Sequence, residues 1–282
     1  MIQKKNKALL ITIGDELLIG QTIDTNSAWI AQQLNKLGID IIKRIAVADE
    51  VNPIKSALDE AIKNAQFVFI TGGLGPTTDD ITKPLLCDYF QSTLIRNKEV
   101  EEHVKTIFTK RNRPILERNL KQADVPDNCK VLFNQLGTAP GMWFEKDGKI
   151  FVSMPGVPFE MKGMMDEYVI PELLKKFEIT PIEHRTLLTA GIGESFLAEL
   201  LTNFEASLSY GIKLAYLPNY GMVRLRLSTT QALDNNSVLD KYFNELKEIV
   251  KDFLVIDKDI SLQEAISEKL KSSHKSLALA ES

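Results

Sequence analysis

Cysteine, histidine and tryptophan are scarce in this chain of 282 residues, which contains two, three and two of them, respectively. Cys87 and Cys129 lie far apart and show no CxxC or metal-ligand spacing, so we expect two buried, reduced thiols rather than a disulfide or zinc framework. The three histidines are scattered along the chain and do not indicate a Ser-His-Asp arrangement. The sequence therefore argues against disulfide-rich, zinc-finger and triad-based hydrolase classes.

Long apolar runs and a strong excess of one charge are also absent. The apolar run after the lysine-rich start extends only from Ala8 to Ile13, which is too short for a signal peptide or a membrane span. The net charge is −4, and Lys and Arg are scattered rather than clustered, which weighs against a general nucleic-acid-binding protein. We therefore expect a cytoplasmic protein that has no membrane partner.

The rest of the composition is that of a globular protein, with 44% hydrophobic and 26% charged residues. Strand patterns alternate with amphipathic helix patterns over residues 1–172, where strands are predicted at 7–13, 39–48 and 66–71. Such alternation predicts an α/β fold in which a largely parallel sheet forms the middle of three layers. Residues 183–256 show a different pattern and predict a small α+β domain.

The pattern changes once more from residue 257 to residue 282. A helix with apolar residues on one face is followed by the apolar residues 277–280, which predict a short strand. A strand that begins so near the last residue indicates that 257–282 is the beginning of a further, truncated domain.

The chain is organised around TGGLGPTTDD, residues 71–80, which follows a buried apolar strand. The glycines allow a ligand to approach the backbone closely, and their amides can form a nest for a phosphate or pyrophosphate. Asp79 and Asp80 place two carboxylates where a divalent cation can bridge protein and phosphate, although either acid can instead cap the next helix. The other candidate substrate-binding residues of this loop are Gly72, Gly73, Gly75, Pro76, Thr77 and Thr78.

A second candidate loop, GDELLIG at residues 14–20, follows the first predicted strand. Gly14 ends that strand, and Asp15 and Glu16 lie just beyond its carboxyl end, where open α/β sheets bind ligands. A solvated loop acid is the alternative for Glu16. Asp24 and Asn26 follow as candidate ligand contacts, and helix capping is the alternative for both.

A third junction of the same kind is MPGVPFEM, residues 154–161, where a strand runs into a loop and a helix. The free amides of a helix start can bind an anion, and an acid there can contact a ligand. Lys83, in the first turn of the helix after the Gly-rich loop, can reach a phosphate or can simply be solvated. The candidate contacts at the third junction are Pro155, Gly156, Pro158 and Glu160.

Five separated motifs resemble, in the same order, those of the competence/damage-inducible CinA family. They are GDELLIGQTIDTN, TGGLGPTTDDIT, NLKQADVP, GTAPG and MPGVP, and the resemblance extends over the whole chain. The first part is also similar to the MoaB/MogA-type molybdopterin-binding domain. By this resemblance Asp80 matches the acid of the molybdopterin-binding loop, and Asp79 is the additional acid of the CinA version.

The resemblance implies a metal-dependent ADP-ribose pyrophosphatase in the N-terminal domain, a KH-like middle domain and a C-terminal nicotinamide mononucleotide deamidase domain. The last three residues, AES, match the start of the AESCTGG motif of that third domain, so we expect no deamidase activity from this chain. The implied cofactor is a divalent cation (Mg, Mn or Co), with Asp15, Asp79 and Asp80 as ligands. Asp79, Asp80 and Glu16 are the expected catalytic residues.

Two other functions fit the same motifs. The first is a module that binds a molybdopterin-type ligand without hydrolysis, and the second is a truncated nicotinamide-nucleotide amidase that lacks its catalytic domain. The KH-like domain shows no GXXG loop flanked by basic residues, so packing or dimerisation is preferred to RNA binding. The expected partners are a small nucleotide substrate and a second copy of the chain in a homodimer.

Overall fold

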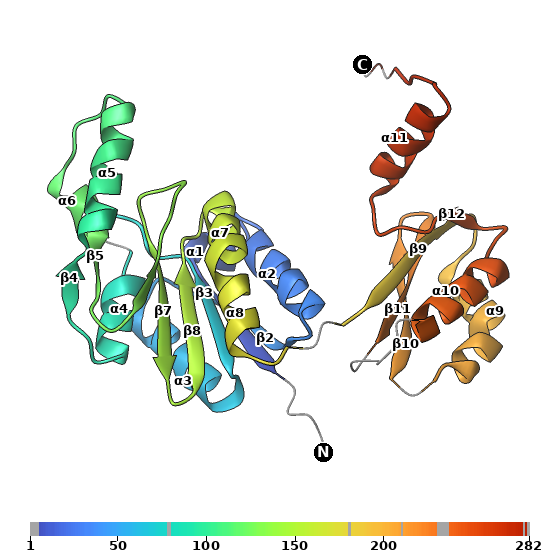
Figure 1. Cartoon of the computed structure of the whole chain (residues 1–282), viewed down its shortest axis with the longest axis horizontal. Coiled ribbons are helices and arrows are strands. Elements are labelled where there is room, and N and C mark those ends of the chain that lie inside the picture. Colours follow the sequence, from blue (N-terminus) through green and yellow to red (C-terminus); the bar gives the residue numbers. More distant parts are fainter. Residues whose placement is uncertain are drawn as a thin grey trace. The chain divides into compact units, whose positions relative to one another are not determined.

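The computed structural model describes residues 6–77, 80–179, 182–209, 211–229, 237–278 and 280. The chain divides into two compact units, Met1–Ile179 and Thr180–Ser282, which Figure 1 shows in sequence colours. Within the described residues, no helix is long and apolar enough to cross a membrane.

A six-stranded mixed sheet forms the centre of the first unit. Four neighbouring strands are parallel, whereas the two strands at one edge alternate in direction. The order across the sheet is β2 (Asp40–Val47), β1 (Lys7–Ile13), β3 (Phe67–Thr71), β8 (Lys149–Met154), β7 (Gly141–Lys146) and β6 (Lys130–Leu132).

Helices cover both faces of this sheet, so the unit has the three predicted layers (Figure 1). Side chains of β1 alternate between two cores, since Leu9 and Ile11 pack on one face and Ala8 and Leu10 on the other. One face is covered by α3 (Val51–Asn64) and α4 (Thr82–Tyr89), and the other by α2 (Thr25–Lys36), α7 (Pro158–Met164), the π-helical turn η2 (Met165–Val169) and α8 (Ile170–Lys176).

The spacing of apolar residues in the sequence explains how a helix such as α3 packs on the sheet. On α3 the apolar residues Ile54, Ala57, Leu58 and Ala61 recur at three- and four-residue intervals and are all buried against the sheet.

Trp143 on β7 is 2% exposed, and Trp29 lies half-buried on α2, so both tryptophans of the chain belong to the first unit.

The segment between α4 and β6 forms a structure that we call the arm, residues 94–126. It stands at the α4 end of the first unit in Figure 1. Val100 and Val104 on one of its helices pack on Ala123 and form a small core of their own. The elements of the arm are β4 (Leu94–Arg96), α5 (Lys98–Lys110), α6 (Glu117–Leu120), the 3-10 turn η1 (Lys121–Ala123) and β5 (Asp124–Pro126).

The second unit is the small α+β structure that the sequence predicts. Its four-stranded antiparallel sheet, in the order β10-β11-β9-β12, shares one core with α9 and α10. The elements are β9 (His184–Ala190), α9 (Glu194–Ser207), β10 (Ile212–Asn219), β11 (Met222–Thr229), α10 (Ser237–Ile249), β12 (Leu254–Ile256) and α11 (Leu262–Ser272).

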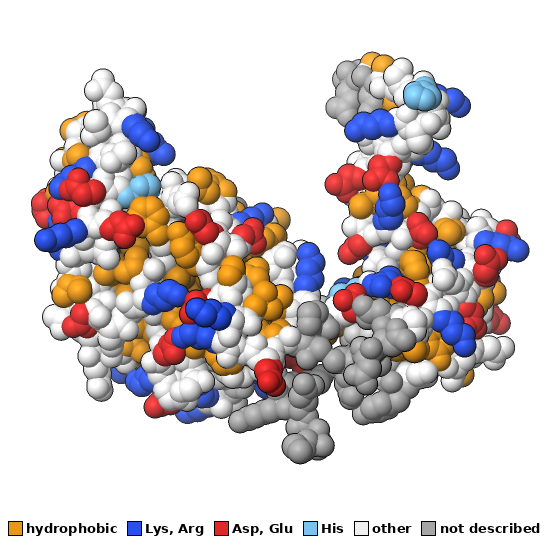
Figure 2. All heavy atoms as spheres, in the orientation of Figure 1, with side chains coloured by type: hydrophobic (Ala, Val, Ile, Leu, Met, Phe, Trp, Pro, Cys, Tyr) orange, Lys and Arg blue, Asp and Glu red, His pale blue; other side chains and the backbone are white. Residues whose placement is uncertain are grey.

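The strand predicted at 277–280 is wrong for the residues of that segment that the structure describes. Residues 277, 278 and 280 belong to no strand, because an extended segment needs a neighbouring strand for its backbone hydrogen bonds. In the view of Figure 2, Lys and Arg side chains lie among Asp and Glu side chains on both units, as the scattered charges of the sequence predict.

Candidate functional site

The carboxyl ends of β2, β1, β3 and β8 lie side by side at one edge of the central sheet. β1 and β3 pair directly, which brings GDELLIG and the Gly-rich loop to the same edge. From β1 the chain goes on to β2 on one side, whereas the Gly-rich loop after β3 leads toward β8 on the other. The crevice between β1 and β3 is therefore the topological switch point where ligands bind in open α/β sheets.

Gly72 holds the Gly-rich loop between two strand ends. Its N–H donates a hydrogen bond of 3.1 Å to the carbonyl oxygen of Met154, at the end of β8. Its φ is +106°, and a Cβ atom there would lie 2.1 Å from the carbonyl oxygen of Ile13, at the end of β1. Glycine is thus required at this position by both dihedral angle and space.

Asp80 lies inside the Gly-rich loop and fixes its shape. Its carboxylate accepts hydrogen bonds from the N–H groups of Gly75, at 2.7 Å, and Thr77, at 2.9 Å, and also from the Thr77 hydroxyl. Two of the three glycine amides predicted to bind an anion, those of Gly72 and Gly75, therefore already donate within the protein.

The alternative that Asp80 caps the next helix is wrong. The N-cap of α4 is Ile81, and the hydrogen bonds of the Asp80 carboxylate go to Gly75 and Thr77 instead. The predicted residues Thr78 and Asp79 lie outside the described part of the chain, so their roles remain predictions. Pro76 and Thr77 are exposed at the tip of the loop.

The sequence reasoning missed Asp49, which lies opposite Asp15. The N–H of Asp15 donates to the Asp49 carboxylate at 3.1 Å, and the N–H of Asp49 donates to the Asp15 carboxylate at 3.3 Å. Asp49 follows β2 just as Asp15 and Glu16 follow β1, and the pairing of β1 with β2 brings the acids together. The position of Asp49 directly after the strand predicted at 39–48 was the signal available in the sequence.

The environment of Asp49 raises the pKa of its carboxyl above the usual value. Burial is the largest cause, and the charges of Asp15, Glu16 and Asp80 act in the same direction, whereas the hydrogen bond from the Asp15 N–H acts against them. Acids from the ends of β1, β2 and β3 thus share one electrostatic environment.

The chemistry of these acids fits a divalent cation. Mg and Mn prefer carboxylate oxygens, and a cation beside Asp15 and Asp49 would relieve the repulsion that raises the Asp49 pKa. Among the described residues, no group of three or more acid, histidine or cysteine side chains is already arranged around a common metal position. The predicted set of Asp15, Asp79 and Asp80 cannot be compared with this result, because Asp79 is outside the described residues.

A small cavity of about 110 Å³ opens beside the acids, between the ends of β1 and β3 and the start of α2. Asn26 is 8% exposed and donates from Nδ2 to the carbonyl oxygen of Gly156 at 2.7 Å, while its buried Oδ1 has no hydrogen-bond partner among the described residues. Five predicted contacts line the cavity: Glu16, Asp24, Asn26, Gly156 and Pro158.

The capping alternative is confirmed for Asp24 and wrong for Asn26. The Asp24 carboxylate accepts a hydrogen bond of 2.9 Å from the N–H of Ser27, and it also accepts one from the Thr12 hydroxyl at 3.2 Å. Glu16 is exposed, so both of its interpretations stay open. Gly14 is buried at the end of β1, where its N–H donates to the carbonyl oxygen of Val47 at 3.1 Å.

Glu160 faces another loop. Its carboxylate accepts a hydrogen bond of 2.7 Å from Asn134 Nδ2, and Asn134 Oδ1 accepts from the N–H of Gly137 at 2.9 Å. Glu160 therefore holds the turn that contains the GTAPG motif, and its contact with a ligand remains a prediction. Pro155 is buried, and Gly156 lies against Gly72, so this third junction packs on the Gly-rich loop.

Lys83 is 9% exposed, so the alternative of a solvated lysine is wrong. Its Nζ donates to the carbonyl oxygens of Gln122, at 2.9 Å, and Lys121, at 3.3 Å, both in η1. Burial lowers the pKa of the Lys83 ammonium to about 8, although the charge of Asp124 acts against this shift. Contact of Lys83 with a phosphate remains a prediction.

Lys83→Met is expected to change how stability depends on pH. The ammonium has a pKa of about 8 when folded and about 10.5 when unfolded, so the unfolded chain binds more protons between these values. The free energy of unfolding of the wild type should therefore rise by about 2–3 kcal/mol relative to Lys83→Met as the pH rises through this window. Urea denaturation of both proteins at several pH values measures the difference.

The titration of Cys129 contributes equally to the unfolding free energy of both proteins, so it does not affect their difference. Burial raises the pKa of its thiol to about 12, and the thiol is present in both proteins. A difference in unfolding free energy that stays constant across the window would contradict a buried cation at position 83.

Comparison with known proteins agrees with this arrangement. A family described as "Probable molybdopterin binding domain" matches residues 9–175, and one described as "Damage-inducible protein CinA KH domain" matches residues 184–255. The CinA-like protein of Flavobacterium psychrophilum is 44% identical over 281 residues, which are 98% of this chain and 67% of the relative. The chain belongs to the CinA-like family.

Other members of the CinA-like family support this assignment. The CinA-like protein of Cytophaga hutchinsonii is 44% identical over 278 residues, 97% of this chain and 66% of the relative. The crystal structure of the protein CinA from Thermoplasma acidophilum is 30% identical, with a TM-score of 0.54, and covers 61% of this chain and 98% of that one.

The predicted CinA resemblance is thereby confirmed, as are the MoaB/MogA-type fold of the first unit and the KH-like character of the second. The chain spans about two thirds of the length of the curated relatives that it matches. The activities of these longer CinA-like proteins are therefore not assigned to the two units of this chain.

Proposed function

We propose that the first unit of this CinA-like protein hydrolyses the pyrophosphate bond of a nucleotide such as ADP-ribose, with Mg, Mn or Co as cofactor. The observation that supports this most is the meeting of Asp15, Glu16, Asp49 and Asp80 beside the Gly-rich loop. A pyrophosphate repels nucleophiles because of its negative charge, so its hydrolysis needs charge neutralisation and a positioned water molecule.

The acids divide this work between them. Asp15 and Asp49, with the predicted ligand Asp79, would hold the divalent cation, which supplies positive charge to the phosphates when it is bound. Asp80 holds the loop in shape through the N–H groups of Gly75 and Thr77. Glu16, the catalytic acid that the sequence predicts, lines the cavity beside these acids and would accept a proton from water.

The reaction itself needs no covalent intermediate with the protein. The oxygen of water forms a bond to one phosphorus atom while Glu16 accepts the proton from that water. The bond between this phosphorus and the bridging oxygen breaks, and the bridging oxygen leaves with the other phosphate. With ADP-ribose the products are AMP and ribose 5-phosphate.

A second candidate function is the binding of a molybdopterin-type ligand without hydrolysis. It is favoured by the match of residues 9–175 to the molybdopterin-binding family and by the structural role of Asp80. The hydrogen bonds that the Asp80 carboxylate accepts from its own loop account for an acid at this position without a catalytic role. Asn26 Oδ1, which has no hydrogen-bond partner in the described part of the chain, lies near the cavity and suits a ligand that carries an N–H group.

The direct test is AMP release from ADP-ribose by the purified full chain, with and without added Mg, Mn or Co. We expect turnover only with a divalent cation, and we expect Asp79→Asn to reduce it by about tenfold to a thousandfold because one carboxylate charge is lost. The predicted involvement of Asp79 is thereby tested without disturbing the bonds that Asp80 makes.

The same assay separates the two candidate functions. A folded wild-type protein that releases no AMP with any of these cations would refute the hydrolase proposal. Tight binding of molybdopterin by that inactive protein, with no effect of Asp79→Asn, would then establish the binding function.

A further inference from the structure

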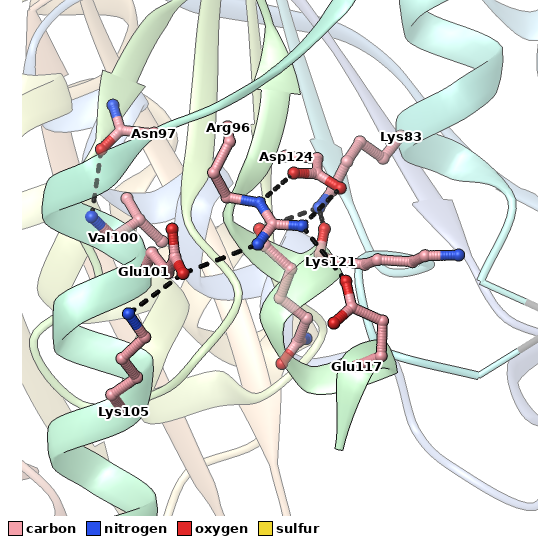
Figure 3. Close-up of polar contacts among 10 residues, drawn as sticks. Lys83, Arg96, Asn97, Val100, Glu101, Lys105, Glu117, Lys121 and Asp124 are labelled. Atoms are coloured by element: carbon pink, nitrogen blue, oxygen red, sulfur yellow. Dashed lines mark hydrogen bonds and ion pairs between the residues drawn. The ribbon is translucent and has the colours of Figure 1, made fainter. Parts of the chain in front are cut away.

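Lys83 is a buried ammonium group close to the candidate site. It lies three residues after Asp80, in the first turn of α4, and its hydrogen-bond partners are the carbonyl oxygens of Gln122, at 2.9 Å, and Lys121, at 3.3 Å. Lysine is almost never buried unless it is paired. Figure 3 shows the side chain of Lys83 reaching from α4 to the backbone of η1, whereas the ammonium group of Lys121 points away.

Gln122 reaches the Gly-rich loop from the same turn. Its side chain is 3% exposed, and Nε2 donates to the carbonyl oxygen of Leu74, at 3.4 Å. The start of α4 also holds the loop, because the N–H of Thr82 donates to the carbonyl oxygen of Gly73 at 3.2 Å. Two successive carbonyl groups of the loop are thus held by two elements, α4 and η1, which Lys83 in turn holds together.

The other elements of the arm hold η1 in position. The N–H of Asn97, just before α5, donates to the carbonyl oxygen of Ala123 at 2.8 Å, and Ala123 is fully buried. Beside it, Arg96 interacts with three acids at once (Figure 3). These acids are Asp124 of β5, Glu101 of α5 and Glu117 of α6.

We propose that Lys83 and Gln122 are positioning residues, through which the arm holds the Gly-rich loop in the conformation that the reaction needs. The proposal rests on the hydrolysis proposed above. A displacement of reacting groups by about 1 Å can cost a hundredfold in rate, so a hold on two loop carbonyls is enough to matter. Neither residue needs to touch the substrate for this role.

This role differs from the phosphate contact that the sequence suggests for Lys83. A lysine that binds phosphate in both ground state and transition state mainly lowers KM, so its loss raises KM and leaves kcat intact. A positioning residue that sets the loop for the transition state mainly affects kcat. Loss of Lys83 should therefore raise KM if the residue binds phosphate and lower kcat if it positions the loop.

The test uses the full chain with Lys83→Met, Gln122→Leu, the double variant and Lys121→Met. Lys121→Met is the matched control, because only the backbone carbonyl of Lys121 takes part and its side chain is exposed. With ADP-ribose and Mg, we expect kcat to fall by about 10- to 100-fold in Lys83→Met, with KM within about threefold of the wild type. Lys121→Met should match the wild type.

The double variant tests whether both residues act through the loop. Its kcat should lie within about threefold of that of Lys83→Met, because the effects of residues that act as one unit are not additive. A wild-type kcat in folded Lys83→Met overturns the proposal, and so does a rise in KM with kcat intact. If Lys83→Met does not fold, a wild-type kcat in Gln122→Leu overturns it.

A second measurement does not depend on turnover. Amide hydrogen exchange of the loop peptide 72–77 should be faster in Lys83→Met than in Lys121→Met, and equal exchange overturns the proposal. If the wild type releases no AMP, the hydrolysis proposal fails, and this exchange measurement, repeated with Gln122→Leu, still decides whether Lys83 and Gln122 hold the loop.

Discussion

Replacing Asp49 by asparagine is expected to reduce AMP release from ADP-ribose by about a hundredfold or more. Asparagine keeps the size of the side chain and an oxygen that can accept the hydrogen bond from the N–H of Asp15, at 3.1 Å in the wild type. It removes the negative charge with which Asp49 would hold the divalent cation. The loss should therefore appear in kcat, measured by AMP release with saturating Mg.

Glu50→Gln is the matched control for this variant. Glu50 is the next residue, it is exposed, and its side chain does not cap α3. The same change of charge at Glu50 should leave the rate within about twofold of the wild type, because exposed charges are strongly screened. Equal rates for Asp49→Asn and the wild type would remove Asp49 from the proposed mechanism.

Replacing Gly72 by alanine is expected to lower the free energy of unfolding by about 3 kcal/mol or more. The added Cβ atom would lie 2.1 Å from the carbonyl oxygen of Ile13, and a φ of +106° is unfavourable for any residue with a Cβ atom. The backbone has to move to remove the overlap, so the bond from Gly72 to Met154 should weaken as well. Urea denaturation followed by circular dichroism measures the change.

Gly148→Ala separates the clash from the dihedral angle. Gly148 also has a positive φ, +72°, but a Cβ atom there meets nothing within 4 Å. Its replacement should therefore cost only the strain of the left-handed conformation, about 1–2 kcal/mol. If the two alanine variants lose the same stability, the overlap of the added Cβ atom at position 72 with the end of β1 adds nothing to the loss of stability.

Much of the first unit could be predicted from local patterns. An apolar run that ends in glycine indicates a buried strand followed by a loop, and Gly72 at the end of β3 occupies that position. Asp24 could be predicted as a cap because it precedes a helical pattern by one residue and its side chain bonds three residues ahead. Both signals lie within a few residues of the feature that they predict.

Other parts of the site depend on contacts between distant segments, which local patterns do not contain. Asp49 lies next to Glu50 in a loop without glycine, and it matters only because β1 and β2 pair and bring it to Asp15. The contact of Gln122 with Leu74 spans 48 residues. Lys83 was predicted in two roles, and the position of η1, also far along the chain, shows that it is not solvated.

The placement of the two tryptophans gives the protein a built-in optical probe. Trp29 and Trp143 both lie in the first unit, whereas the second unit contains no tryptophan. Indole emission shifts when a buried ring such as that of Trp143, 2% exposed, enters water, so the emission follows the melting of the first unit alone. Far-ultraviolet ellipticity reports the helices of both units. Midpoints that coincide for the two signals would show that the units unfold together, and separate midpoints would show that each one unfolds by itself.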